Sequence, residues 1–409
     1  MATFPLPLNQ LLGKYGAYFV YLLIGFAFGY VLEISGFANS PKLAAQFYFK
    51  ELTVLKVMFT AIVVAMVLIF AASGLGLLDY NLIWVNPTYL VPGILGGFIM
   101  GLGFIIGGFC PGTSLVALST LKIDGLFFTL GSLFGIFLFG ETVDFYDRFW
   151  HSTYMGRFTL PQWLGTSTGT VVILIVLMAL FMFWGAEQLE RIFGGKDMKR
   201  EPKVRYAGAS ALLLGAIAVW LIGQPTTTDR WARITSQKEP LLKERAVYIH
   251  PGELLATMHD HQIKLVLLDV RSEADYNLFH LADAQRVPLD QLADIVSELH
   301  LEPANTVIVV MSNDETLATE GWKILVAESV PNVYILEGGI NKWLEVFAKD
   351  ENRIRPLAQG ADEQLRYEFA AALGAAFPAA EPHPEHFDIE YVPKIKLDIK
   401  RAPSGGGCG

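Results

Sequence analysis

Apolar residues dominate the first half of this chain, and most of the charged residues lie beyond Glu187. Six apolar runs approach the ~20 residues that a helix needs to cross the hydrocarbon core of a bilayer. The pattern predicts six membrane-spanning helices, at roughly Gly16–Ile34, Thr53–Phe70, Tyr89–Gly107, Leu121–Gly140, Thr166–Ala186 and Ala207–Gly223.

Beyond Ala246 the pattern changes to short β runs that alternate with helical stretches. Buried parallel strands are predicted at Leu265–Val270, Thr306–Met311 and Asn332–Leu336. Such alternation is typical of an α/β domain. We therefore expect a polytopic α-helical membrane domain at 1–225, a linker at 226–245, an α/β domain at 246–350 and a C-terminal extension at 351–409. Within the extension we expect a short helix at Ala361–Gly374 and an edge strand at Phe387–Ile399.

Composition agrees with this division, because 53% of the residues are hydrophobic and only 17% are charged. The net charge of −9, with no Lys/Arg run interleaved with aromatic residues, argues against nucleic-acid binding. Basic residues orient membrane proteins because they favour cytoplasmic loops. Those of the fifth loop are Arg191, Lys196, Lys199, Arg200, Lys203 and Arg205. This topology predicts that both termini and the α/β domain lie outside the cytoplasm.

The membrane half contains an internal repeat with a constant offset of 72 residues (97 − 25). The matched pairs are Gly25 with Gly97, Gly29 with Gly101, Gly36 with Gly108, Phe37 with Phe109, Ala38 with Cys110 and Lys50 with Lys122. Duplicated units with broken helices are common in transporters. The alternative is a chance spacing of small residues that pack membrane helices.

Cys110 lies in the second repeat, directly before Pro111. Proline favours the first position of a helix, so Cys110 is predicted at a helix N-terminus, where unpaired N–H groups attract anions. Thr113 and Ser114 are candidate hydroxyl donors. The residues suit a small anion whose soft sulfur atom faces the thiol. The alternative is a buried apolar cysteine beside packed glycines.

These residues also carry a family resemblance. The runs Gly96–Gly103 and Gly107–Thr113 resemble the signature of the YeeE/YedE sulfur-transport family, and Gly29–Phe37 is similar to its companion motif. The resemblance implies transport of thiosulfate or a related sulfur compound. It points to substrate-binding residues at Gly36, Phe37, Gly108, Phe109, Cys110, Gly112, Thr113 and Ser114. The companion motif usually ends in cysteine, and this chain has Ala38 there.

The second half resembles a rhodanese domain. The matching residues are Leu268–Arg271, Tyr276, His280–Ala284 and Leu336–Trp343. A rhodanese has a nucleophilic cysteine after the strand that ends near Met311, followed by glycine and arginine. Here the loop begins with Ser312, Asn313 and Asp314, and serine does not hold a stable persulfide. The resemblance therefore implies a rhodanese-like domain that is not an enzyme, with Asp269 and Arg271 as a structural pair.

Cys408 is the second of only two cysteines and follows three glycines near the chain end. The ending resembles the swinging arm of the SoxY sulfur carriers, which implies a mobile sulfur-carrying thiol. An incidental cysteine in a tail is the alternative.

The leading hypothesis is a multi-pass transporter of the bacterial inner membrane, with a small sulfur anion as substrate and no cofactor or metal. Its other expected contacts are membrane lipid, periplasmic sulfur-metabolism proteins and a second copy of itself. One competing hypothesis is a membrane-anchored sulfur carrier that does not transport. Another is a rhodanese enzyme with serine at its catalytic position.

Overall fold

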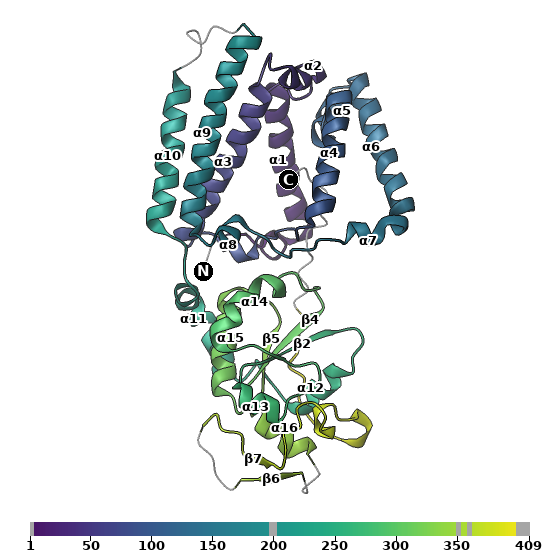
Figure 1. Cartoon of the computed structure of the whole chain (residues 1–409), viewed down its shortest axis with the longest axis vertical. Helices are drawn as coiled ribbons and strands as arrows, with labels where there is room; N and C mark the ends of the chain where they lie inside the picture. The colour runs from purple at the N-terminus through teal and green to yellow at the C-terminus, as the bar shows by residue number, and fades with distance from the viewer. Residues whose placement is uncertain (1–3, 196–202, 349–352, 358–361, 398–409) are drawn as a thin grey trace. The chain divides into compact units, whose positions relative to one another are not determined.

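The computed structural model describes residues 4–195, 203–348, 353–357 and 362–397. The chain divides at Pro225 into a membrane unit and an α/β unit (Figure 1). Each unit has cores of its own, and each is described by itself below.

Six helical segments among the described residues are long and apolar enough to cross a membrane, as the hydrophobic pattern predicted. Their bounds are Leu8–Ile34 for α1, Thr53–Gly74 for α3, Leu90–Ser119 for α4 with α5, Ile123–Trp150 for α6 with α7, Thr168–Phe193 for α9 and Val204–Ile222 for α10. Two short helices, α2 (Ser40–Ala44) and α8 (Leu160–Leu164), lie in the connections.

The third span is broken in two. Helix α4 (Leu90–Gly107) ends where Gly108 takes a left-handed φ of 73°, a conformation that costs glycine little. Helix α5 (Pro111–Ser119) begins three residues later, with Cys110 as its N-cap and proline in its first turn. The break therefore places Cys110 inside the span, between two helix ends.

Helices α3, α9 and α10 form the packed part of the membrane unit. Their shared core contains small and β-branched side chains, namely Val63, Val67, Val172, Val176, Ala179, Ala216 and Val219. The buried Glu190 of α9 accepts hydrogen bonds from the backbone N–H of Leu52 at 2.7 Å and from Lys56 Nζ at 2.8 Å. A buried carboxylate needs such partners. The two hydrogen bonds of Glu190 therefore hold the start of α3 against the end of α9.

The α/β unit is built on a five-stranded parallel sheet in the order β1-β5-β4-β2-β3. Figure 1 labels its three central strands, β5, β4 and β2. The strands are β1 (Tyr248–Ile249), β2 (Lys264–Asp269), β3 (Gln285–Arg286), β4 (Thr306–Met311) and β5 (Val333–Leu336). The three predicted strands are confirmed to within one residue at either end. Strand β4 is buried throughout.

Side chains of β4 alternate between the two faces of the sheet, as the pleat requires. Val307, Val309 and Met311 join a core with helices α12 (Pro251–Met258) and α16 (Gly339–Phe347). Ile308 and Val310 join a second core, on the face that carries α14 (Leu292–Leu299) and α15 (Thr316–Ala327).

The stretch 226–245, expected as a linker, forms helix α11 (Thr227–Lys243). Trp231 of α11 packs edge-on against Trp322 of α15, with ring centroids 6.1 Å apart. Arg230 pairs with Glu328, whose carboxylate also accepts a hydrogen bond from Thr227 at 2.6 Å. This helix is therefore a packed part of the α/β unit.

Two predictions for the C-terminal extension are wrong. In place of a helix at Ala361–Gly374, Tyr367–Phe369 is strand β7, which pairs antiparallel with β6 (Ile354–Pro356) and turns apolar side chains onto the core. Residues 387–397 form no strand, because the N–H groups of Lys394 and Ile395 donate to the Glu253 carboxylate at 2.6 and 2.7 Å instead of to a neighbouring strand.

Candidate functional site

The first candidate site surrounds Cys110 at the start of α5. Cys110 and Thr113 form a reciprocal capping box. The Cys110 N–H donates to Thr113 Oγ1 at 2.9 Å, and the Thr113 N–H donates to Cys110 Sγ at 3.4 Å. The thiol is half-buried. The cap therefore fixes the thiol at the helix N-terminus without enclosing it.

Beside the thiol, Gly112 leaves both space and an N–H donor. A Cβ added to Gly112 would lie 4.0 Å from Cys110 Sγ, an ordinary van der Waals contact, with no other described atom within 4 Å. Among the residues that the structure describes, no hydrogen-bond acceptor faces the Gly112 N–H. The start of α5 thus has one free donor next to a soft sulfur atom.

The two predicted hydroxyl donors are engaged within the motif. Thr113 Oγ1 lies 3.1 Å from the Cys110 carbonyl and 3.3 Å from its sulfur. Ser114 Oγ donates to the Pro111 carbonyl at 2.8 Å and accepts from Thr129 at 3.3 Å. Both side chains are buried. They hold the shape of the helix start.

The structure brings the two repeat motifs together. Phe37 and Phe109 are buried in one cluster, with Ala38 beside them. Gly36 and Gly108 both take left-handed φ values, 80° and 73°. A side chain at position 108 would clash, because an added Cβ would lie 2.9 Å from the Ser40 side chain. Phe37 and Phe109 therefore pack in one cluster, and Gly36 and Gly108 form the turns that precede them; the predicted role of all four in substrate binding stays a prediction.

Polar residues that the motif analysis did not single out as site residues link the two repeats. Lys122 Nζ donates to the Ala38 carbonyl at 2.9 Å and lies 4.0 Å from Glu33 Oε1. Ser40 Oγ donates to Asp124 Oδ2 at 2.7 Å. Ionisable residues in membrane spans are rare and usually functional. Glu33 and Asp124 could therefore have been identified from the sequence, as ionisable residues within predicted membrane spans.

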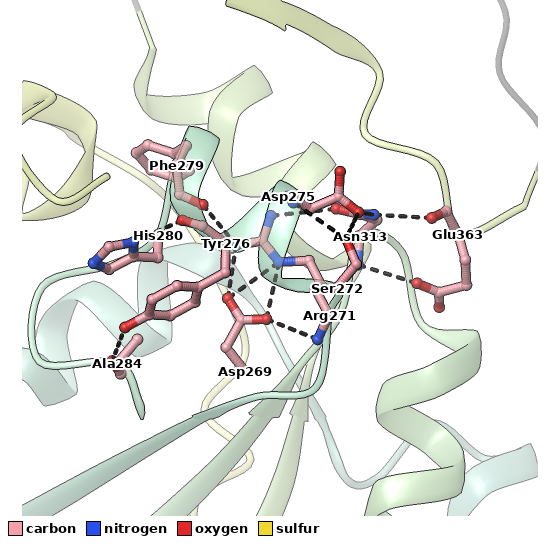
Figure 2. Close-up of polar contacts among 10 residues, drawn as sticks. All are labelled: Asp269, Arg271, Ser272, Asp275, Tyr276, Phe279, His280, Ala284, Asn313 and Glu363. Atoms are coloured by element: carbon pink, nitrogen blue, oxygen red, sulfur yellow. Dashed lines mark hydrogen bonds and ion pairs between the residues drawn. The ribbon is translucent and has the colours of Figure 1, made fainter. Parts of the chain in front are cut away.

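The second candidate site lies at the carboxyl ends of β2 and β4, which are adjacent parallel strands. Figure 2 shows Arg271 at its centre. The Arg271 guanidinium, fully buried, bonds to Asp269 at 2.6–3.1 Å, to the Phe279 carbonyl at 2.7 Å and to Asn313 Oδ1 at 3.2 Å. With its donors satisfied by the protein, Arg271 holds the loops together, in line with the predicted structural pair.

Ser312 and Asn313 are buried in the loop that follows β4. The Ser312 hydroxyl donates to Glu363 Oε1 at 2.9 Å and accepts from the Ala318 N–H at 3.2 Å. The Asn313 N–H donates to Glu363 Oε2 at 3.1 Å (Figure 2). Glu363 comes from the extension and has no motif, so sequence reasoning missed it.

The pKa values of Asp314 and Glu363 are shifted in opposite directions. Burial and a hydrogen bond shared with Asp314 raise the pKa of Glu363 to about 7. Burial works against ionisation of Asp314 too, but hydrogen bonds from Glu363 and from the N–H groups of Thr316 and Glu315 outweigh it and lower the pKa of Asp314 below its usual range. Glu363 therefore keeps its proton at mildly acidic pH and loses it as the pH rises through about 7, whereas Asp314 is already ionised.

Two further predictions concern metals and the tail. The described residues contain no group of three or more His, Cys, Asp or Glu side chains that suits a metal ion. Cys408 lies outside the described residues.

The comparisons with known proteins also divide the chain into two parts, but the two family matches meet at residue 250, beyond the structural division at Pro225. Residues 36–249, just over half of the chain, match the model of the sulphur transport family, and residues 250–346 match the rhodanese-like domain. The chain belongs to the sulphur transport family. The membrane match begins at Gly36, so it includes the second repeat motif and only the end of the first. The rhodanese-like match includes the loop at Ser312.

Among its relatives is a protein of Spirochaeta thermophila named thiosulfate transporter TsuA. It is 28% identical over 228 residues, which are 50% of this chain and 64% of that protein. The match thus leaves about a third of the relative without a counterpart here. A crystal structure of a full-length protein from Lactobacillus plantarum, 26% identical, covers 27% of this chain and 92% of that one at a TM-score of 0.23.

Proposed function

We propose that this protein transports thiosulfate or a related small sulfur anion across a membrane, with Cys110 in the path. The observation that carries the proposal is the half-buried thiol at the start of α5, inside a broken span, beside the free N–H of Gly112. Membership of the sulphur transport family and a relative named as a thiosulfate transporter support it.

The chemistry of the helix start suits an anion that has both oxygen and sulfur ends. N–H groups at a helix N-terminus favour negatively charged oxygens. The Cys110 sulfur is soft and polarisable, so it favours a soft sulfur atom as neighbour. In this proposal the anion also contacts the predicted residues of the two repeat motifs, Gly36, Phe37, Gly108 and Phe109. Gly112 leaves space for the anion.

We also infer that a second copy of the chain completes the membrane path. The apolar stretches of α1, α4 and α6 are only 6% buried, against 33% for α9. Added Cβ atoms at Gly25, Gly29, Gly97 and Gly101 would meet nothing within 4 Å among the described residues, whereas one at Gly215 would lie 2.9 Å from Val67. Small residues in spans mark helix–helix interfaces. The repeat gives α1 and α4 matching faces, which suits pairing between two copies.

Mass photometry in lipid nanodiscs tests the second copy. Wild type should be a dimer, and Gly97→Leu should shift it to a monomer, while Gly185→Leu on the equally open face of α9 should not. A monomeric wild type that transports would contradict the inference.

The rhodanese-like domain, in this proposal, is a docking module without sulfurtransferase activity. Ser312 stands where a rhodanese has its nucleophile, and a serine oxygen does not hold a persulfide. The domain and the tail lie in the periplasm of a bacterial inner-membrane protein, where Cys408 carries sulfur to or from the pore or to periplasmic sulfur-metabolism proteins. A Cys408 thiolate that takes the outer sulfur of thiosulfate becomes a persulfide, and sulfite leaves.

Uptake of radiolabelled thiosulfate by proteoliposomes tests the function. Transport by wild type, with none in empty liposomes, is the expected result. The alternative function, a membrane-anchored carrier without transport, predicts no uptake but a tail peptide heavier by one sulfur atom after exposure to thiosulfate. A membrane-impermeant thiol reagent applied to cells should label Cys408 from outside, and labelling from the cytoplasm alone would contradict the orientation.

A further inference from the structure

Helix α15 begins with an unusual set of partners for its first N–H groups. The first N–H groups of a helix have no partner within the helix. Here the Thr316 N–H donates to Asp314 Oδ1 at 2.9 Å, the Leu317 N–H to Glu363 Oε1 at 2.7 Å and the Ala318 N–H to Ser312 Oγ at 3.2 Å. A carboxyl group from a distant segment thus occupies the centre of the helix start.

Glu363 also binds the loop through its backbone. Its N–H donates to Asp314 Oδ2 at 2.8 Å, and its carbonyl accepts from Asn313 Nδ2 at 2.8 Å. Together with the carboxyl contacts to Ser312 and Asn313, these bonds fasten the extension to the loop 312–317 at one residue. Figure 2 shows the contacts between Glu363 and Asn313. Release of Glu363 would therefore break the hydrogen bonds of this residue to Ser312, Asn313, Asp314 and Leu317, while the start of α16 stays bonded to Ser312 and Asn313.

The charged side chain nearest to this carboxyl is negative. Asp314 shares a hydrogen bond with it directly. Asp275 reaches it only through Asn313 Nδ2, at 3.0 Å, and Arg271 only through Asn313 Oδ1. Glu315 points to Arg245 and to the Gly338 N–H. No cation among the described residues contacts Glu363, so two ionised carboxylates would repel each other here.

We propose that Asp314 and Glu363 form a proton-operated latch, which holds the extension over the Ser312 loop while they share a proton and releases it when the proton is lost. Opening would uncover the Ser312 hydroxyl and the N–H groups of Asn313 and Leu317. These lie next to a cavity of about 530 Å³ lined by Asp314, Lys342 and Arg366, among others. The latch goes beyond the transport function and does not depend on it.

The direction of the pH effect follows from the raised pKa of Glu363. The pKa of Glu363 is about 7 in the closed state and 4.5 when the carboxyl is free. Protonation of Glu363 therefore stabilises the closed state, and this contribution is fully present below pH 4.5. That contribution is lost as the pH rises to about 7. Between about pH 5 and about pH 7 the opening constant should rise on the order of fortyfold. The lowered pKa of Asp314 acts only at acid pH and leaves this window unchanged.

Hydrogen–deuterium exchange of the full-length protein in nanodiscs tests the latch. After correction for intrinsic rates, the N–H groups of 362–369 and 313–318 should exchange tens of times faster at about pH 7 than at about pH 5. Glu363→Gln keeps the size and can accept through one oxygen, whereas its amide nitrogen cannot accept the bonds of the other. It cannot ionise, so its exchange should be the same at both pH values. Glu363→Ala should exchange fast at both.

Glu368→Gln provides the matched control, because it removes an exposed carboxyl of β7 in the same segment. It should behave as wild type. Equal corrected exchange of wild type at the two pH values, or the wild-type pH dependence in Glu363→Gln, would overturn the latch. Exchange of β4 (Thr306–Met311) serves as the measure of folding in every variant.

Discussion

Two helices of this chain begin beside a small side chain of nucleophilic type, and the two starts are built in opposite ways. At α5, Cys110 is half-buried and the Gly112 N–H has no acceptor among the described residues. At α15, Ser312 is fully buried and a carboxyl from Glu363 takes up the loop donors. One start leaves room for a ligand, while the other is already occupied.

The residues around the two helix starts also differ: those around Ser312 form a closed polar network, and those around Cys110 are mostly apolar. Behind Ser312 lies the buried network of Asp269, Arg271 and Asn313, which satisfies its own charges. Beside Cys110 lie glycines and aromatic side chains, with Lys122 turned to the Ala38 carbonyl. A closed polar network favours a fixed architecture. The comparison therefore supports the proposal that sulfur chemistry belongs to the membrane unit and that the Ser312 loop has a structural or regulatory role.

The largest expected effect comes from breaking the network behind Ser312. Arg271→Met leaves the fully buried Asp269 without its cation, which typically costs about 3–5 kcal/mol. The exchange protection of β4 in the full-length protein should fall accordingly, while that of α9 should not. Arg355→Met, at an exposed position on β6, is the control and should leave both unchanged. A stable Arg271→Met protein would show that the network is not structural.

Next in size is the effect of a thiol placed in the closed loop. Ser312→Cys, in a background of Cys110→Ser and Cys408→Ser, should react slowly with a thiol reagent, because reactivity depends on exposure. Addition of Glu363→Ala should raise the rate by roughly tenfold or more, since it opens the loop. Stopped-flow or timed mass spectrometry gives both rates. Equal rates would mean that Glu363 does not close the loop.

A smaller effect is expected at the cap of α5. Thr113→Ala removes the hydroxyl that accepts from the Cys110 N–H, at a cost of about 1 kcal/mol. Because the cap orients the thiol, thiosulfate uptake should fall a few-fold. Thr113→Ser retains the hydroxyl and should keep most of the uptake. Loss of uptake in both variants would point to packing of the threonine methyl group instead.

The spans, the three strands and the helix start at Cys110 were predictable because each rests on a local pattern: apolar length, alternation, or proline after a glycine turn. The extension was not. Tyr367–Phe369 looks helical in isolation, and only pairing with β6 and burial against the core make it a strand. Non-local packing overrode the local preference there.

The candidate sites were predictable to different degrees. Gly36, Phe37, Gly108 and Phe109 occupy matched positions of the repeat and were predicted as substrate-binding residues. The structure places Phe37 and Phe109 in one buried cluster, and the binding role stays a prediction. Glu363 lies about 50 positions beyond Ser312 along the chain and has no pattern of its own. Nothing in the sequence links the two, because the contact is made by a loop and an extension that meet only in the fold.

Uptake of radiolabelled thiosulfate by Cys110→Ser in proteoliposomes tests the central claim most directly. Serine is a strong N-cap, so this variant keeps the start of α5 and removes only the soft sulfur atom. Cys408→Ser is measured beside it, so that loss of the tail thiol is seen separately. We predict that Cys110→Ser is folded, dimeric and without measurable uptake. Uptake at the wild-type rate by Cys110→Ser would contradict a role for this thiol in transport.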